Sequence, residues 1–312
     1  MRIDGGSGIT ATSDRSTVGA KAEVAIDAQV AAEWNAPASR PAVSVTAQAD
    51  VKVSAVAAGG GKAAELAQAR VHMALAADVY NDTPNPPAGW SVAGDEDLAR
   101  LGLDPTDLEE AGSDFRARVY VDTAGDYVAA FRGTQSAADW KANLQQGLGL
   151  DSGHYDKALL IGERLRAAGE DVTLTGHSLG GGLASAAAVA SGLPADTFNA
   201  AGLHEDTLEA AQSGGAPAPQ VDAYYIDGDP LSRVQDGGDR WLGAGLGGLV
   251  GGIPGAILGG LFLDAPPAYG ERHALTAVGP EGQSADDASL LDLHGQAWLT
   301  SSLDAAYRAA AN

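Results

Sequence analysis

The chain has 312 residues, enough for one domain of ordinary size with additional segments or for two smaller domains, and 45% of them are hydrophobic. Asp and Glu number 41 against 19 Lys and Arg, which gives a formal net charge of -22. Such an acidic surface repels the phosphate backbone of nucleic acids and has no electrostatic attraction for anionic lipid. The composition therefore argues against nucleic-acid binding, and a lipid substrate would have to be held by apolar contacts.

Cysteine is absent, which excludes disulfides, a thiol nucleophile and any cysteine-ligated metal site. The first twenty residues contain no continuous apolar stretch, so we expect no cleavable secretory signal. The protein is then either cytoplasmic or exported by a route that does not need such a peptide.

Two regions of different composition follow one another along the chain. Residues 1–62 are rich in Ala, Val, Ser and Gly, have Trp34 as their one aromatic residue, and end in the linker-like GGGK. We expect a flexible leader there and a folded domain over 63–312. This domain opens with apolar residues at helical spacing, which predict a helix that ends at the breaker NDTPNPPAGW.

Strands and helices alternate through the rest of the domain. The runs RARVYVD and YVAAF on either side of TAGD predict a hairpin over 116–131. Further strands are predicted at 171–176, 196–202 and 220–229, and helices at 136–149, 154–170, 181–192 and 289–311. This alternation predicts an α/β fold with a largely parallel central sheet flanked by helices.

Residues 242–263, LGAGLGGLVGGIPGAILGGLFL, interrupt this pattern, because they carry no charge and place a glycine at every fourth position. That spacing puts a smooth stripe on one helical face, and the length would span a bilayer. However, each glycine weakens a helix in water by roughly 1 kcal/mol relative to alanine. The segment is a substrate-side lid or mobile insert, a piece of buried core, or a membrane-inserting segment.

The sequence Gly176-His177-Ser178-Leu179-Gly180 matches G-x-S-x-G and has a predicted strand before it and a helix after it. In that setting the serine lies on a sharp turn with strained backbone, and its hydroxyl projects from the C-terminal edge of the sheet. The N-terminus of the following helix supplies N–H groups that suit a developing oxyanion. The motif predicts Ser178 as a nucleophile, and the alternative is a serine that merely caps the helix.

A serine nucleophile needs a base and an acid, which follow it in the chain order Ser, Asp or Glu, His. We predict His294, in DLHGQAWL, as the base, with His273 as its rival; His204 comes too early for that order. For the acid we predict Asp229, which precedes a proline where the chain leaves a strand, and we interpret Asp227 as a turn former.

The second oxyanion donor is expected in the loop FRGT, which follows the predicted strand YVAAF. The backbone N–H groups of Thr134 and Leu179 would form the oxyanion hole, and the Thr134 hydroxyl could add a third donor. The alternative is a strand-terminating glycine beside an arginine held in a local ion pair.

FRGTQSAADWKANLQQ, followed some forty residues later by VTLTGHSLGGGLASAAA, resembles the class 3 lipases, the fungal-type triacylglycerol lipases with their bacterial phospholipase relatives. The resemblance covers about residues 65–235 and extends loosely to His294. It implies the α/β-hydrolase fold and a Ser-Asp-His triad, with Ser178 as nucleophile, Asp229 as acid and Thr134 lining the hole. PPAGW, FRGT and TFNAAGLH are closer to bacterial phospholipase effectors than to secreted fungal enzymes.

These observations predict a serine ester hydrolase acting on lipid, most simply an A-type phospholipase that forms an acyl-enzyme. No metal or organic cofactor is expected, and no calcium loop of the EF-hand type is present in the sequence. A phospholipid surface is the expected partner, with a cognate immunity protein if the chain leaves the bacterial cytoplasm as an effector toxin. The alternatives are a soluble carboxylesterase or thioesterase, and a membrane-inserting toxin that acts through 242–263.

Overall fold

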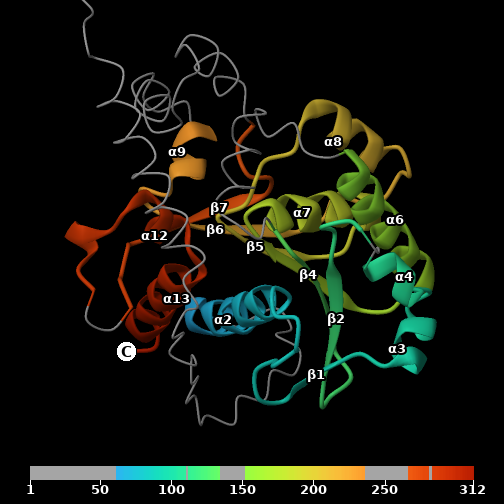
Figure 1. Cartoon of the computed structure of the whole chain (residues 1–312), viewed down its shortest axis with the longest axis horizontal. Helices are drawn as coiled ribbons and strands as arrows, with labels where there is room; N and C mark the ends of the chain where they lie inside the picture. The colour runs from blue at the N-terminus through green and yellow to red at the C-terminus, as the bar shows by residue number, and fades with distance from the viewer. Residues whose placement is uncertain (1–60, 110–111, 134–151, 236–265, 281–282) are drawn as a thin grey trace, which may run out of the picture.

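The computed structural model describes residues 61–109, 112–133, 152–235, 266–280 and 283–312 (Figure 1). Its strands are β1 (Trp90–Val92), β2 (Ala117–Asp122), β3 (Tyr127–Phe131), β4 (Val172–His177), β5 (Ala195–Phe198), β6 (Val221–Ile226) and β7 (Glu271–Leu275). Its α-helices are α2 (Lys62–Asp78), α3 (Asp95–Arg100), α4 (Pro105–Leu108), α6 (Ser152–Ala168), α7 (Leu179–Ser191), α8 (Glu205–Gln212), α9 (Pro230–Gln235), α12 (Leu290–His294) and α13 (Gln296–Ala310).

Four features predicted from the sequence lie outside the described residues. They are the leader up to residue 60, the helix at 136–149, the oxyanion-hole residue Thr134, and the glycine-rich segment 242–263.

The strands form one sheet in chain order from β1 to β7. β1, β2 and β3 are antiparallel neighbours, whereas each pair from β3 to β7 is parallel, which confirms the largely parallel sheet. The pairing of β2 with β3, in which Ala117 lies opposite Phe131, confirms the predicted hairpin. Because the parallel strands run in one direction, the C-terminal ends of β4, β5 and β6 meet at the same edge of the sheet.

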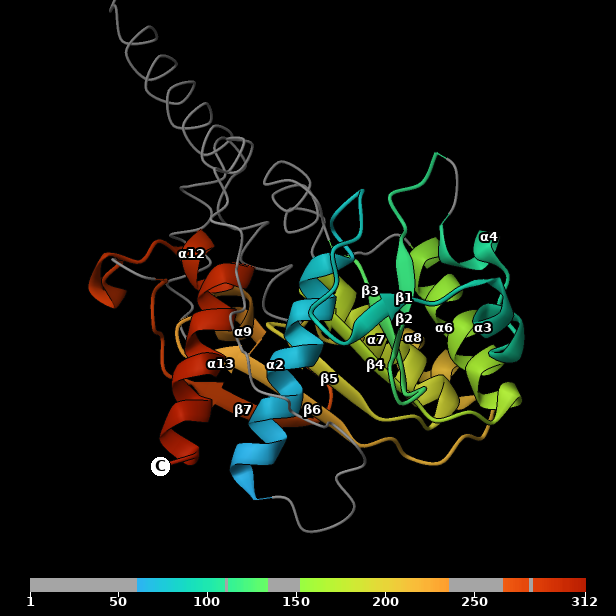
Figure 2. The same ribbon diagram turned by 90° about the horizontal axis from the view of Figure 1, so that it is seen from below.

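Helices cover both faces of the sheet (Figures 1 and 2). α6, α7 and α8 lie on one face, and α2 and α13 lie side by side on the other. Right-handed crossovers between parallel strands that follow one another across a sheet place their helices on the same face. Helices from the two ends of the described chain therefore cover the face that the crossovers leave open.

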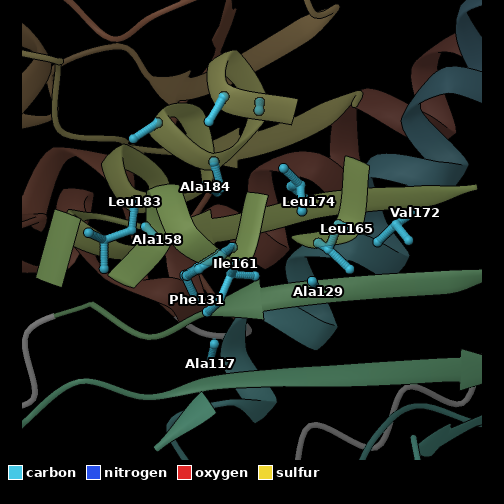
Figure 3. Close-up of a cluster of buried hydrophobic side chains, with 14 of the residues drawn as sticks. Ala117, Ala129, Phe131, Ala158, Ile161, Leu165, Val172, Leu174, Leu183 and Ala184 are labelled. Atoms are coloured by element: carbon cyan, nitrogen blue, oxygen red, sulfur yellow. The ribbon is translucent and has the colours of Figure 1, made fainter. Parts of the chain in front are cut away.

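The face beneath α6 and α7 carries the larger apolar core (Figure 3). Phe131 and Leu174 from neighbouring strands lie in one buried cluster with Ile161, Leu165 and Leu183 from the two helices. α7 is buried along nearly its whole length, because its glycines, alanines and serines are small enough to fit between the sheet and α6. The predicted helix over 181–192 is thus confirmed.

The face beneath α2 and α13 carries a second core. Phe198 and Tyr224 stack with ring centroids 5.7 Å apart, and they share a buried cluster with Met73 of α2 and with Trp298 and Leu299 of α13. This packing holds the C-terminal helices against the sheet, and the position of His294 depends on it.

The structure differs from the sequence prediction in its smaller elements. β1, β7 and the short helices α3, α4, α8 and α9 were not predicted, because runs of three to eight residues carry too little periodicity. The prediction of one continuous helix over 289–311 was wrong, since Gly295 is extended (φ -71°, ψ 148°) and separates α12 from α13. His294 therefore ends a short helix and does not open the long one.

Gly162 allows α6 to approach α7 closely, because a Cβ atom there would lie 2.5 Å from the Ala187 carbonyl oxygen. We expect Gly162→Ala to lower the free energy of unfolding by about 2 kcal/mol. Overpacking against backbone costs up to about 3 kcal/mol, which outweighs the roughly 1 kcal/mol of helix propensity that alanine gains. Urea unfolding measures the change.

The matched control is Gly214→Ala, where the nearest atom to a new Cβ is Arg166 Nη1 at 3.7 Å. Its unfolding free energy is expected to stay within about 0.5 kcal/mol of wild type. A Gly162→Ala protein at least as stable as wild type would contradict this description of the helix contact.

Candidate active site

Ser178 lies on a sharp turn between β4 and α7 and has a backbone conformation that is rare for a side-chain-bearing residue, with φ 60° and ψ -127°. Its side chain makes no capping hydrogen bond to α7. The helix-cap alternative is therefore wrong. The backbone strain costs about 1–3 kcal/mol, and such strain is typical of functional sites.

Glycines make this turn possible by removing side chains where backbones meet. A Cβ atom at Gly176 would lie 2.2 Å from the Gly180 carbonyl oxygen, and one at Gly180 would lie 2.2 Å from the Phe131 carbonyl oxygen. The Ser178 amide donates to the Phe198 carbonyl at 3.0 Å, and the Ser178 carbonyl accepts from Ala201 N at 3.0 Å. The turn is thus held by hydrogen bonds to Phe198 of β5 and to Ala201, and it packs closely against the end of β3.

Three side chains predicted from the sequence meet at the end of β4. His294 Nε2 lies 2.8 Å from Ser178 Oγ, and His294 Nδ1 lies 2.7 Å from Asp229 Oδ1. All three residues are buried, with 5% of Ser178, 1% of His294 and none of Asp229 exposed. A carboxylate oxygen accepts a hydrogen bond, so Nδ1 carries the hydrogen and Nε2 is left to accept that of the serine hydroxyl.

Asp229 is fixed in place by the start of α9. Its Oδ2 accepts a hydrogen bond from Ser232 N at 2.7 Å, which leaves Oδ1 for His294. Asp227 is exposed in the preceding turn, where Gly228 has φ 99°, so this aspartate takes no part in the cluster. The structure thus separates the two carboxylates that the sequence placed at this strand end.

The other two histidines considered from the sequence lie elsewhere. His273 is on β7, with its Nε2 2.7 Å from Asp222 Oδ1 and its ring stacked on Tyr224 at 4.9 Å. His204 precedes α8, and its Nε2 is buried without a hydrogen-bond partner among the described residues. Neither histidine shares a hydrogen bond with Ser178.

One of the two predicted oxyanion donors can be located. Leu179 is the first residue of α7, and an N–H in the first turn of a helix has no carbonyl partner within that helix. Thr134 lies outside the described residues, but Gly133 before it packs against the turn. A Cβ atom on Gly133 would lie 2.6 Å from the His177 carbonyl oxygen, so the chain at Gly133 approaches the serine turn closely.

Two residues at the site were not singled out from the sequence as functional. His177 and Asn199 both have a side-chain nitrogen at hydrogen-bond distance from the backbone carbonyl of His294, at 2.8 Å and 3.2 Å. His177 is the second residue of the G-x-S-x-G match and Asn199 follows β5 in TFNAAG. Sequence alone gave no sign that either side chain turns toward the C-terminal helices.

One group in the described part of the chain has the composition of a metal site. Glu65, Asp222 and His273 each place a ligand atom within 4.8 Å of the others, on the face covered by α2. These atoms have protein partners, since His273 bonds to Asp222 and the Tyr224 hydroxyl donates to Glu65 at 3.0 Å. We interpret the group as a polar link between α2 and the sheet.

Comparison with known proteins places the chain in a family. A family model described as the Tle-like phospholipase domain matches residues 71–281. The chain belongs to this family. Ser178 and Asp229 fall inside the matched range, and His294 follows it.

The chain is also 39% identical over 169 residues to the extracellular phospholipase A1 of Serratia liquefaciens. That match covers 52% of this chain and 53% of the relative, so the chain spans about half of the relative's length. Among solved structures it is similar to a triacylglycerol lipase from Penicillium expansum, at 13% identity and a TM-score of 0.41, covering 75% of this chain and 88% of that one.

The lipase of Rhizomucor miehei in its propeptide complex is similar at 19% identity and a TM-score of 0.35, with 54% of this chain and 63% of that one covered. Neither structural likeness is close enough to carry a residue's role to this chain. Among the described helices, none combines the length and the apolar character needed to cross a membrane.

Burial, and then the nearby His294, lowers the pKa of His177 from 6.5 to about 3. Between these pH values the unfolded chain binds a proton that the folded chain does not. The free energy of unfolding therefore falls as the pH drops below 6.5, by up to about 1.4 kcal/mol per pH unit from this residue. His177→Gln lacks this titrating group. Between pH 7 and pH 4 we therefore expect its free energy of unfolding, measured with urea, to fall less steeply with pH than that of wild type, by up to about 1.4 kcal/mol per pH unit. Parallel pH dependences in the two proteins would contradict it.

Proposed function

We propose that this protein is a serine ester hydrolase of the phospholipase A type, with Ser178, His294 and Asp229 as its catalytic triad. The observation that carries the proposal is the continuous line of hydrogen bonds from Ser178 Oγ through both ring nitrogens of His294 to Asp229 Oδ1. A hydroxyl at its ordinary pKa is a poor nucleophile, and an adjacent base oriented by a carboxylate is what activates it.

The reaction follows from this geometry. Ser178 Oγ attacks the ester carbonyl carbon while His294 Nε2 takes the hydroxyl proton. Asp229 holds Nδ1–H and stabilises the imidazolium that forms. Collapse of the tetrahedral intermediate breaks the bond to the alcohol oxygen, which takes the proton from His294. Water then attacks the acyl-enzyme while His294 Nε2 takes its proton, and the fatty acid leaves as Ser178 Oγ takes that proton back from His294.

The oxyanion of the intermediate needs preorganised donors. The Leu179 N–H at the start of α7 is one, aided by the helix dipole, and we propose the Thr134 N–H as the other. The packing of Gly133 against the turn supports this, because it brings the preceding part of the FRGT loop to the same edge of the sheet. Losing one such donor typically lowers the rate about 100- to 1000-fold.

The substrate class follows from the family and from its relative. The Tle-like phospholipase domain spans most of the described chain, and the relative from Serratia liquefaciens is a phospholipase A1. We therefore propose a fatty acyl ester of a phospholipid as the substrate and residues 63–312 as the hydrolase domain. With a net charge of -22, contact with a membrane surface would be made by apolar residues.

Export and a protein partner belong to the same proposal. The relative is extracellular, and the sequence motifs resemble bacterial phospholipase effectors, so we propose that the protein acts outside the producing cell. A lipase active on phospholipid endangers the membranes of the cell that makes it. A cognate immunity protein that masks the Ser178 site is therefore the expected partner.

Lipid mass spectrometry of phospholipid vesicles tests this function. Wild-type protein is expected to release free fatty acid and lysophospholipid, because hydrolysis of one acyl ester yields both. Ser178→Ala and His294→Ala are expected to lower the rate by at least about 1000-fold, since each removes a member that the triad requires.

His273→Ala is the matched control, because it removes a hydrogen-bonded histidine from the same sheet that does not contact Ser178. Its rate is expected to stay close to that of wild type. Equal product from wild type and Ser178→Ala would overturn the proposed function, and loss of activity in His273→Ala with His294→Ala active would overturn the choice of base.

A further inference from the structure

The backbone carbonyl of the proposed base receives hydrogen bonds from two side chains on different strands. His177 Nε2 lies 2.8 Å from the His294 carbonyl oxygen, and Asn199 Nδ2 lies 3.2 Å from it. Asn199 Nδ2 also donates to the carbonyl of Leu293 at 3.0 Å. A carbonyl oxygen only accepts, so His177 must carry its hydrogen on Nε2.

Both donors are themselves held firmly by the sheet. His177 is the last residue of β4 and directly precedes Ser178. Asn199 follows β5 and has a left-handed φ of 41°. Its backbone N–H donates to the Tyr224 carbonyl oxygen at 2.9 Å, and its side-chain Oδ1 accepts from the backbone N–H of Ile226 at 3.0 Å. Asparagine tolerates that φ better than most residues, and here its side chain bridges the ends of β6 and α12.

His177 also reaches the opposite side of the site. The Tyr80 hydroxyl lies 3.3 Å from the His177 carbonyl oxygen and 3.4 Å from His177 Nδ1, and it accepts a hydrogen bond from Gly133 N at 2.9 Å. A line of hydrogen bonds thus runs from the FRGT loop through Tyr80 and His177 to the backbone of His294. Burial lowers the pKa of His177 and keeps its ring neutral.

The helix that carries His294 is short. α12 is five residues long, and Gly295 behind it is extended. The His294 ring must nevertheless satisfy Ser178 and Asp229 at the same time, at 2.8 Å and 2.7 Å. A displacement of about 1 Å in such an arrangement can cost about 100-fold in rate.

We propose that His177 and Asn199 are positioning residues that hold the catalytic base by its own backbone carbonyl. The two donors approach one oxygen from strands β4 and β5, and so fix the peptide plane from which the imidazole extends. The His177 ring lies against that of His294, with centroids 5.0 Å apart. A neutral ring at this distance does not repel the imidazolium that forms during the reaction. This role rests on the proposed hydrolase function.

Steady-state hydrolysis of a soluble short-chain ester, p-nitrophenyl butyrate, by a set of His177 variants tests the role. His177→Leu removes the donor, whereas His177→Gln keeps an N–H at a similar reach. We expect His177→Leu to lower kcat by about 10- to 100-fold with KM within about twofold of wild type, because the base is misplaced while substrate contacts remain. His177→Gln should recover kcat to within about fivefold of wild type.

A merely structural role for His177 would give a different pattern. It would lower the melting temperature of both variants without separating their kcat values, so unfolding is measured in parallel. His273→Leu, which removes a hydrogen-bonded histidine outside the site, is expected to keep wild-type kcat. The proposal is overturned if folded His177→Leu retains kcat within about twofold of wild type, or if folded His177→Gln is as slow as His177→Leu.

Asn199→Asp provides a second variant should His177→Leu fail to fold. It keeps the shape, the Oδ1 acceptor for Ile226 N and the tolerance for φ 41°, but it replaces the N–H donor by an oxygen facing two carbonyls. A kcat lowered by about tenfold or more is expected, and an unchanged kcat overturns the role. Wild type no faster than Ser178→Ala on this ester would instead overturn the hydrolase function, and the positioning role with it.

Discussion

The strained backbone of Ser178 is the constraint on which the site depends. A φ of 60° in a residue with a side chain is unfavourable, and it persists because the surroundings leave the turn no other conformation. The backbones at Gly176 and Gly180 lie too close together to leave room for a Cβ atom at Gly176. The Phe198 carbonyl accepts a hydrogen bond from the backbone N–H of Ser178. The turn directs the hydroxyl away from α7 and toward the C-terminal helices.

The parallel sheet brings the other residues of the site close to that turn. β4, β5 and β6 end at the same edge, so Ser178, Asn199 and Asp229 lie close together although they are far apart in the chain. His294 comes from the opposite face, where α13 packs beside α2 on an apolar core. The site therefore depends on packing at both ends of the described domain, and the base lies on a helix of only five residues. Two strand-end side chains compensate for that by binding its carbonyl.

Much of this arrangement could be predicted from the sequence because the signals are local. In the hairpin over 116–131 the first run alternates and TAGD marks the turn before a continuous apolar run. The G-x-S-x-G match has a strand and a helix beside it, and Asp229 stands before a proline at a strand end. The predicted chain order excludes only His204 of the three histidines after Ser178, and the structure brings His294 and not its rival His273 to the serine. Each of these inferences needs only a window of residues and the direction of a parallel strand.

The remainder depends on contacts between distant segments. The strand around His273 is short and charged, so its pairing with β6 is set by tertiary structure and not by periodicity. Gly295 breaks a helix whose residues on both sides favour helix formation. The contacts of His177 and Asn199 with His294 join positions about a hundred residues apart, and no spacing rule connects them. Residues 134–151 and 236–265 lie outside the described structure, so the predictions for Thr134 and the glycine-rich segment remain predictions.

The central claim is that the buried hydroxyl of Ser178 is made reactive by the imidazole of His294. Covalent labelling of the folded protein with a fluorophosphonate, followed by peptide mass spectrometry, tests it most directly, because the reagent reports nucleophilicity without any assumption about lipid. We expect a single modified peptide with the adduct on Ser178, and almost no labelling in His294→Ala. Absence of labelling in wild type, or undiminished labelling in His294→Ala, would contradict it.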